Sequence, residues 1–383
     1  MDAWIAQHAE RIATRAPREL EALVAVSSPS GDVRGADEAV AVATALLPEA
    51  AEVERVPCSS PGHADDLVAR VRGTGAGRIV LLGHLDTVVA HDAHRPLARD
   101  GERLVGSGSV DMKGGDVLAL GVLRALAEDP SRFAEAALLL VVDEEWRTAP
   151  FGHVERFAGF DACLCFEAGE VDGEGRDAVV VERKAAGTLR VRGHGRSAHS
   201  GSAPHKGVNA LLALARAAQA VAGCHDPQGP DRLTAVPTVM RSGDAFNVVP
   251  AAGELVCDLR AERAEAFDGV IAALPAEVDG ATLEADLLRV WPGMHAWEAT
   301  APVLADAATD LGRPVVGARR GGASDASHFA SAIAVTIDGL GPRGGGAHAP
   351  YEHVLEGSLR TRAEVALSVA NAVLKRRGAD ADS

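Results

Sequence analysis

The fold class is decided by a stretch in the first third of the chain, which reads Arg78-Ile79-Val80-Leu81-Leu82-Gly83-His84-Leu85-Asp86-Thr87. Its run of Ile, Val and Leu predicts a short buried strand over 78–83, and polar residues follow directly where that strand ends. Outward from this stretch, helices are expected at 4–26, 35–47 and 116–126, and apolar strands at 136–142 and 162–166. This alternation predicts an α/β fold, with a mostly parallel sheet and helices on both faces.

The pattern changes near Arg183. Polar and apolar residues alternate at 188–192 and 255–260, on either side of a predicted helix at 207–222, which indicates a small α+β unit with one solvated sheet face. The α/β pattern then resumes with a helix at 299–311, a strand at 333–337 and a closing helix at 356–374. We therefore predict a main domain at 1–183 and 294–383, interrupted by an inserted α+β domain at 184–293.

Length and composition agree with two folded domains and limit the kinds of molecule that the protein is expected to bind. The 383 residues exceed the usual size of a single hydrophobic core, and 47% hydrophobic against 24% charged residues is ordinary globular composition. The net charge of −16 repels phosphate backbones and anionic lipid. Aromatic residues make up only 3%, which leaves no stacking platform for bases. Neither nucleic acid nor membrane is expected as a partner.

Cellular location is predicted from the N-terminus and the cysteines. No basic region followed by an apolar stretch is present near Met1, so no export signal is expected. The longest apolar runs, such as 136–142, are too short to cross a bilayer. The five cysteines are scattered without a CxxC pair, which disfavours both a disulfide framework and a thiolate metal site. We expect a cytoplasmic protein.

Residues that can carry chemistry follow strands or glycine-rich turns at five places. They are His84 in Gly83-His84-Leu85-Asp86, Asp111 in Val110-Asp111-Met112-Lys113-Gly114-Gly115, the pair in Asp143-Glu144-Glu145-Trp146, Glu167 in Phe166-Glu167-Ala168-Gly169, and His348 in Gly346-Ala347-His348-Ala349. Each segment alone has an ordinary structural interpretation, such as a helix N-cap or a solvated loop. Together they predict a dication site, because the ligand crevice of an open α/β sheet lies at the carboxyl ends of its strands.

The number of ligands suits two metal ions. Three carboxylates and two imidazoles are what a pair of Zn²⁺ ions requires if Asp111 bridges them. In the adjacent pair Glu144-Glu145, consecutive residues point apart, so one can bind metal while the other faces the reacting water. The sequence therefore divides the roles of the two glutamates.

These motifs resemble those of the zinc aminoacylase/carboxypeptidase family, which includes acetylornithine deacetylase, succinyl-diaminopimelate desuccinylase and bacterial glutamate carboxypeptidase. The resemblance covers nearly the whole chain, with the motifs in the same order. It implies two Zn²⁺ ions, with Co²⁺ or Mn²⁺ as alternatives. It implies that His84, Asp111 and Glu167 bind one ion, and that Asp111, Glu145 and His348 bind the other.

The same resemblance implies roles for residues around the metals. Asp86 would fix the imidazole of His84, and Glu144 would be the general base. The main domain would be the catalytic domain, and the insertion a lid and dimerisation domain. In the insertion, Arg196-Ser197-Ala198-His199-Ser200-Gly201 resembles a lid motif whose histidine, His199 here, reaches the site of the neighbouring subunit in family dimers.

Substrate-binding positions are implied in the same way. Asn247 and Arg260 match positions that bind substrate oxygen and carboxylate in glutamate carboxypeptidase-like members, and an arginine suits a carboxylate through its bidentate fork. Without the metal motifs, Arg260 would be an ordinary surface charge and His199 an ordinary loop residue. Gly322 and Ser324, in Gly321-Gly322-Ala323-Ser324-Asp325, belong to a glycine-rich loop that could offer backbone N–H groups to an anion.

The expected function is hydrolysis of the amide bond of an N-acyl or peptidyl amino acid, by a homodimer that uses two metal ions. A dizinc aminopeptidase of related fold is one alternative, although it would need an acidic anchor where Arg260 stands. A non-catalytic binding protein is another, although it should lack a ligand or the base. The chain departs from the family at Trp146-Arg147-Thr148 and at the flexible Gly344-Gly345-Gly346, which leaves the choice of substrate open.

Overall fold

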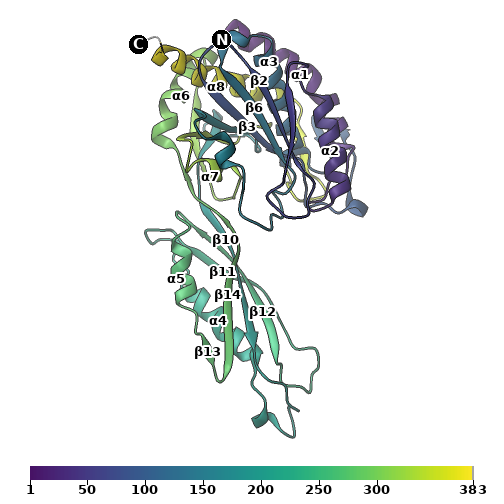
Figure 1. The fold of residues 1–383 in the computed structure, drawn as a ribbon, viewed down its shortest axis with the longest axis vertical. Coiled ribbons are helices and arrows are strands. Elements are labelled where there is room, and N and C mark those ends of the chain that lie inside the picture. The colour runs from purple at the N-terminus through teal and green to yellow at the C-terminus, as the bar shows by residue number, and fades with distance from the viewer. Residues whose placement is uncertain (382–383) are drawn as a thin grey trace. The chain divides into compact units, whose positions relative to one another are not determined.

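The structure, a computed structural model, describes residues 1–381 and divides into two compact units (Figure 1). Unit 1 comprises Met1–Glu182, Met294–Arg320 and the described residues from Ser324 onward, and unit 2 comprises Arg183–Gly293 and Gly321–Ala323. The short segment Gly321–Ala323 joins unit 2, where Nη1 of Arg183 donates to the carbonyl oxygen of Gly322 at 2.8 Å. In sequence, unit 2 is thus an insertion into unit 1.

The main sheet of unit 1 is mixed and mostly parallel. Its strands, in spatial order, are β1 (Glu52–Val56), β2 (Asp66–Arg72), β6 (Glu135–Val141), β3 (Arg78–His84), β7 (Ala162–Cys165) and β17 (Val335–Ile337). The pairs β6·β3, β3·β7 and β7·β17 are parallel, whereas β1 and β2 pair antiparallel at one edge. The predicted α/β class is confirmed, and the antiparallel edge is an addition that the apolar pattern did not indicate.

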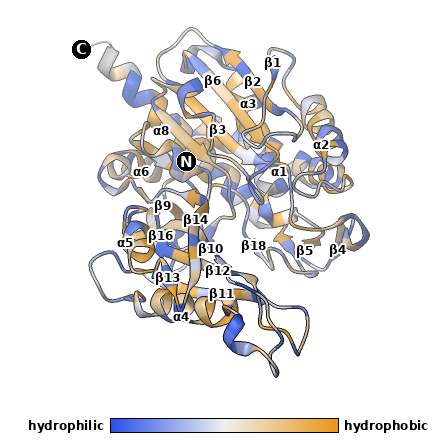
Figure 2. Cartoon of the chain, turned by 60° about the horizontal axis from the view of Figure 1, so that its bottom comes forward, coloured by the Kyte–Doolittle hydropathy of each residue, from blue (hydrophilic) through white to orange (hydrophobic). Residues whose placement is uncertain are grey.

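Both faces of this sheet are buried. Along β3, Ile79 and Leu81 belong to one hydrophobic core and Val80 and Leu82 to a second, as the two-residue period of a strand requires. Five helices contribute to the first core: α1 (Ala3–Val24), α2 (Val33–Ala45), α3 (Gly114–Ala127), α6 (Trp297–Leu311) and α8 (Ser358–Ala381). Short elements, α7 (Ala326–Phe329) and the 3-10 turn Val154–Phe157, contribute to the second. In Figure 2, the central strands β3 and β6 are accordingly coloured mostly as hydrophobic.

Two smaller sheets complete unit 1. One has the order β15 (Met294–His295), β9 (Asp177–Arg183) and β16 (Val315–Arg320), with β8 (Glu170–Val171) paired to β9. The other has the order β18 (Gly344–Gly345), β19 (His353–Leu355), β5 (Arg103–Val105) and β4 (Ala98–Asp100). The loop between β18 and β19 carries His348, so this small sheet holds a predicted site residue.

Unit 2 is a five-stranded antiparallel sheet with two helices. The strand order is β11 (Thr234–Ser242), β12 (Ala252–Ala261), β10 (Ala185–His194), β14 (Ala281–Trp291) and β13 (Glu277–Val278), and the helices are α4 (Ala210–Gly223) and α5 (Ala266–Ala272). Alternate residues such as Leu189 and Val191 of β10 pack with both helices in one core, while Arg190 and Arg192 point to the other face. Strand β11 forms one edge of the sheet.

No helix within residues 1–381 is both long enough and apolar enough to cross a bilayer.

Candidate metal centre

Five of the predicted site residues lie at the ends of strands or in adjoining turns of unit 1. His84 ends β3, Glu145 follows β6 and Glu167 follows β7. Because these three strands are parallel neighbours, their carboxyl ends meet at one edge of the sheet. Asp111 lies in the irregular turn Ser109–Lys113 before α3, and His348 lies between β18 and β19.

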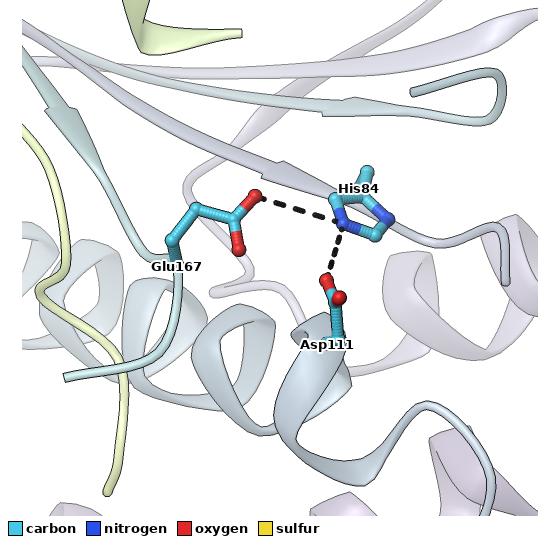
Figure 3. A group of neighbouring side chains, drawn as sticks. All are labelled: His84, Asp111 and Glu167. Atoms are coloured by element: carbon cyan, nitrogen blue, oxygen red, sulfur yellow. Dashed lines mark hydrogen bonds and ion pairs between the residues drawn. The ribbon is translucent and has the colours of Figure 1, made fainter. Parts of the chain in front are cut away.

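The first group consists of His84, Asp111 and Glu167 (Figure 3). Nε2 of His84 lies 3.2 Å from Oδ1 of Asp111 and 3.8 Å from Oε1 of Glu167. The other ring nitrogen, Nδ1, lies 3.1 Å from the backbone oxygen of Asp86 and 3.4 Å from its Oδ1. His84 therefore directs Nε2 into the group, and Asp86 holds the opposite side of the ring.

The second group consists of Asp111, Glu145 and His348. Nε2 of His348 lies 3.2 Å from Oδ2 of Asp111 and 3.2 Å from Oε1 of Glu145. His348 adopts a left-handed backbone with φ of 64°, which is uncommon outside glycine and typical of sites where function requires a particular orientation. Asp111 faces both groups, one through each carboxylate oxygen.

The charges in these groups suit divalent cations. Hydrogen bonds to Asp111 and Glu145 raise the pKa of His348 to about 10. Burial would raise the pKa of Asp111, but hydrogen bonds from His348 and His84 outweigh it and lower the pKa overall. Three carboxylates and two imidazoles, whose ligand atoms lie within 4.8 Å of one another in each group, are a donor set for zinc or a similar ion. The residues present therefore fit a two-metal site.

Glu144 immediately precedes Glu145 in the chain and belongs to neither group. Burial raises the pKa of its carboxyl group well above the ordinary value, as is common for a general base or acid. Its backbone N–H, 3.2 Å from Oδ1 of Asp86, and that of Glu145, 3.1 Å from Oδ2, both donate to the Asp86 carboxylate. Asp86 thus contacts the turn of the two glutamates as well as His84, a second link that the sequence did not suggest.

One residue that holds the main chain at Asp111 was not predicted from the sequence. Glu352, buried with 3% of its surface exposed, accepts the backbone N–H groups of Gly108, Val110 and Asp111 at 2.9 to 3.0 Å. Such a carboxylate fixes the main chain that presents Asp111. No local pattern marks it, because its partners lie more than 240 positions away, although its position four residues after His348 places it in the same loop.

The remaining predicted residues divide between the two units. Ser324 is in unit 1, buried, and its Oγ accepts the N–H of Ala326 at the start of α7. Gly322 is in unit 2, with its carbonyl bound to Arg183. That the backbone N–H groups of this loop bind an anion stays a prediction.

His199, Asn247 and Arg260 all belong to unit 2. Nδ1 of His199 accepts the N–H groups of Gly201 and Ser202 at 3.1 and 3.2 Å, which fixes its tautomer and leaves Nε2 to carry the proton. The carbonyl of Asn247 accepts the N–H of Ser200, in the same loop as His199.

Arg260 is already engaged within unit 2. Its Nε and Nη2 donate to the carboxylate of Asp258 at 3.0 to 3.2 Å, while Nη1 takes no part in this pair. The roles of these three residues toward the two groups stay predictions.

Comparison with known families places the chain among metallopeptidases. The model of peptidase family M20/M25/M40 matches residues 80–372. Carboxypeptidase G2 from Pseudomonas sp. (strain RS-16) is 28% identical over 349 residues, covering 86% of this chain and 82% of that protein. Succinyl-diaminopimelate desuccinylase from Rhodopseudomonas palustris (strain BisB5) is 34% identical over 196 residues, covering 45% of this chain and 50% of that protein.

Solved structures share the fold. Aminopeptidase PepT from Bacillus cereus superposes with a TM-score of 0.75 at 22% identity, covering 94% of this chain and 98% of that one. The M20 family metallo-carboxypeptidase Sso-CP2 from Sulfolobus solfataricus gives a TM-score of 0.73 at 16% identity, covering 94% and 99%. At these identities the likeness concerns the fold alone.

Proposed function

Since the chain belongs to peptidase family M20/M25/M40, we propose that it uses two divalent metal ions to hydrolyse the amide bond between an acyl or peptidyl group and a carboxylate-bearing amino acid. Its family makes it a metallopeptidase-type hydrolase that acts on peptides or N-acyl amino acids. The observation that carries the finer proposal is the pair of three-residue groups that share Asp111.

The ligands divide as the two groups do. His84, Asp111 and Glu167 would hold one ion, and Asp111, Glu145 and His348 the other. We propose zinc, with cobalt or manganese as alternatives, because this nitrogen and oxygen donor set accepts several divalent ions and metal availability decides between them. Metal ions held there would supply Lewis acidity, which would lower the pKa of a bound water molecule.

The chain's own residues move the protons. Glu144, next to the ligand Glu145 and outside both groups, accepts a proton from the attacking water. It then passes that proton to the nitrogen of the leaving amine. Asp86 orients the imidazole of His84 and holds the backbone of both glutamates, so that base and ligands keep a fixed relative position. His199 donates from Nε2 to the oxygen anion that forms at the carbonyl.

Substrate recognition is assigned to unit 2. Arg260 would bind the carboxylate of the leaving amino acid, through the Nη1 edge that Asp258 does not occupy. Asn247 would bind a substrate oxygen. The similarity to carboxypeptidase G2 over 349 residues supports a peptidyl or N-acyl amino acid as the substrate.

We also propose that the protein is a cytoplasmic homodimer joined through unit 2. The edge strand β11 exposes Val236, Val239 and Met240 by 42%, 41% and 38%, and an unpaired apolar edge favours pairing with another strand. All five cysteines are free, as is usual in a reducing compartment.

The test is a substrate panel with metal-loaded protein. N-acyl amino acids, dipeptides and tripeptides with a free α-amine are offered to protein loaded with zinc or cobalt, beside a thoroughly chelated control. We expect turnover of acylated amino acids with a free carboxylate, and its loss on chelation. Activity that survives chelation would overturn the metal-dependent mechanism, and a strict requirement for a free α-amine would favour an aminopeptidase.

A further inference from the structure

Arg147 belongs to the segment Trp146-Arg147-Thr148, where the sequence departs from the family, and its environment is unusual. Only 4% of its surface is exposed, and arginine is rarely buried to this degree unless it is paired. It follows the ligand Glu145 by two positions, so a role in binding the substrate carboxylate would be the simplest assumption. Its contacts show a different arrangement.

Two carboxylates from distant parts of the chain occupy the guanidinium. Nη2 and Nε donate to Oδ1 of Asp143 at 2.8 and 3.2 Å. Nη2 also donates to Oδ2 of Asp325 at 2.7 Å, and Nη1 donates to Oδ1 of the same residue. The carbon of the guanidinium lies 4.8 Å from the centre of the Phe151 ring. All three nitrogens donate to these two carboxylates, so Arg147 does not present a free guanidinium fork to a substrate.

The ion pairs connect directly to the turn of the two glutamates. Asp143 immediately precedes Glu144, and Asp325 stands at the start of α7, so Arg147 joins the end of β6 to that helix. The Asp86 carboxylate holds the backbone of Glu144 and Glu145 from within the turn. Arg147 and its partners hold the residues on either side of the pair.

A planar fork is required for this arrangement. One guanidinium donates to two carboxylates at once, in fixed directions, whereas a lysine ammonium is a point charge on a flexible stem. The side chains of Asp143 and Asp325 are buried, with 0% and 4% exposed. Without Arg147, two buried carboxylates would have no cation between them, and the turn would have to move to admit water.

We propose that Arg147 is a positioning residue, whose ion pairs with Asp143 and Asp325 hold Glu144 and Glu145 in place. The proposal rests on the proposed function, because it assigns a task to the base and to one ligand. It differs from a purely structural role in one respect: loss of Arg147 reduces the rate of the chemical step in protein that is folded and loaded with metal.

A largely buried ion pair elsewhere in unit 1 provides the control. Arg124 of α3 donates to Glu19 of α1 at 2.7 Å, with 12% and 7% of the two side chains exposed. Neither residue contacts the two groups. Replacing Arg124 by Met removes a buried guanidinium without disturbing the glutamate turn.

The experiment compares R147M, R147K and R124M as full-length, metal-reconstituted proteins, with kcat expressed per metal-loaded molecule. We expect R147M to lower kcat about 10- to 100-fold with KM changed less than about twofold, since small misplacement of catalytic groups costs this much. R147K should recover part of the loss. R124M should lower the melting temperature but keep kcat within about twofold of wild type.

A readout independent of turnover accompanies the rates. The visible absorption spectrum of the cobalt-loaded protein reports the coordination geometry of the metal, to which Glu145 would contribute, and we expect it to change in R147M and to stay as in wild type in R124M. If R147M does not fold, D325N takes its place, because it keeps the ion pair between Arg147 and Asp143. We then expect the same changes in kcat and in the cobalt spectrum, but smaller ones. A wild-type protein that hydrolyses nothing in the panel contradicts the proposed function, and the cobalt spectra then decide on Arg147.

The outcome that overturns the inference is an active wild type together with an R147M or D325N protein that has wild-type kcat and a wild-type cobalt spectrum. A loss of rate fully explained by lost metal, or matched by R124M, also overturns it. A double-mutant cycle checks whether Arg147 acts through its ion pair with Asp325. The effect of R147M on kcat should be smaller in the D325N background, because the two residues act through one contact.

Discussion

The roles of Glu144 and its neighbour Glu145 can be separated by substitution, because only Glu145 belongs to one of the two candidate metal groups. Glu144→Gln keeps the size of the side chain and removes its basicity. We expect kcat to fall roughly 10²- to 10⁴-fold, the usual contribution of a general base, with the metal content unchanged. Steady-state kinetics and metal analysis on the same sample measure both. Glu38→Gln, an exposed helix substitution, is the control. Near-wild-type turnover in Glu144→Gln with both metals bound would rule out this role.

The proposed role of His348 as a ligand predicts that metal binding depends on pH. Its contacts with Asp111 and Glu145 raise its pKa in the metal-free protein to about 10, so the ring carries a proton at neutral pH. A metal-binding imidazole must be neutral, and binding therefore releases that proton. The sign follows: below about pH 10, metal affinity weakens as the pH falls, by about tenfold per unit for each proton released.

Calorimetry in buffers of different ionisation enthalpy measures this release directly. We expect at least one proton to leave per protein at pH 7 to 8, and a smaller number in His348→Ala. A binding heat that does not vary with the buffer would contradict the assignment of His348 as a ligand.

Among the elements, α3 lies very close to the end of β7, and one glycine makes this possible. A Cβ atom on Gly115 would lie 1.9 Å from the carbonyl oxygen of Phe166. This close approach places the turn that carries Asp111 beside the residue after Phe166, which is Glu167. The spacing of the first metal group thus depends on a helix and a strand that only glycine allows so near each other.

Gly115→Ala should therefore weaken both the fold and the first metal group. We expect the free energy of unfolding of the metal-free protein to fall by about 1–3 kcal/mol, as for other overpacked sites, together with a loss of zinc affinity. Chemical denaturation and metal titration measure the two effects. Gly378→Ala in α8, where an added Cβ meets no atom within 4 Å, should leave both unchanged or raise stability slightly. Equal behaviour of the two variants would contradict the argument.

Elements with a clear apolar period were predictable from sequence, and others were not. The strand expected at 78–83 is β3 at Arg78–His84, and the helix expected at 116–126 is α3 at Gly114–Ala127. Strand β1 was missed, because four of its five residues are exposed and it has no apolar run. This segment is a strand because it pairs with β2, and its local sequence does not record that pairing.

The residues of the candidate site were likewise predictable from sequence only in part. Its five members stand after strands or glycine-rich turns, so their proximity was expected from the topology of a parallel sheet, and the structure brings them together. Glu352 and Arg147 were not recognised, because their partners lie far away in sequence: Arg147 and Asp325 are 178 positions apart. Contacts of this kind depend on the packing of whole elements, which no local pattern records.

For the whole molecule, the question is whether one chain makes a complete site. The residues of the two candidate metal groups and Glu144 belong to unit 1, whereas His199 belongs to unit 2. In the proposed dimer, His199 of one subunit would serve the candidate metal site of the other. Each site would then need both copies of the chain, and a symmetric pair would contain two such shared sites.

Mixing two inactive variants tests this sharing. His199→Ala and Glu144→Gln homodimers should each be impaired, but a mixed dimer contains one site with both wild-type residues. After random exchange at equal concentrations, half of the dimers are mixed and each has one of two sites intact, so about a quarter of wild-type activity should return. Val239→Lys on the edge strand β11 should prevent the pairing, which light scattering measures as a shift to monomer, and should abolish the recovery. If mixing restores nothing while the dimers exchange subunits, His199 serves its own chain or none, and the dimer is not required for the chemistry.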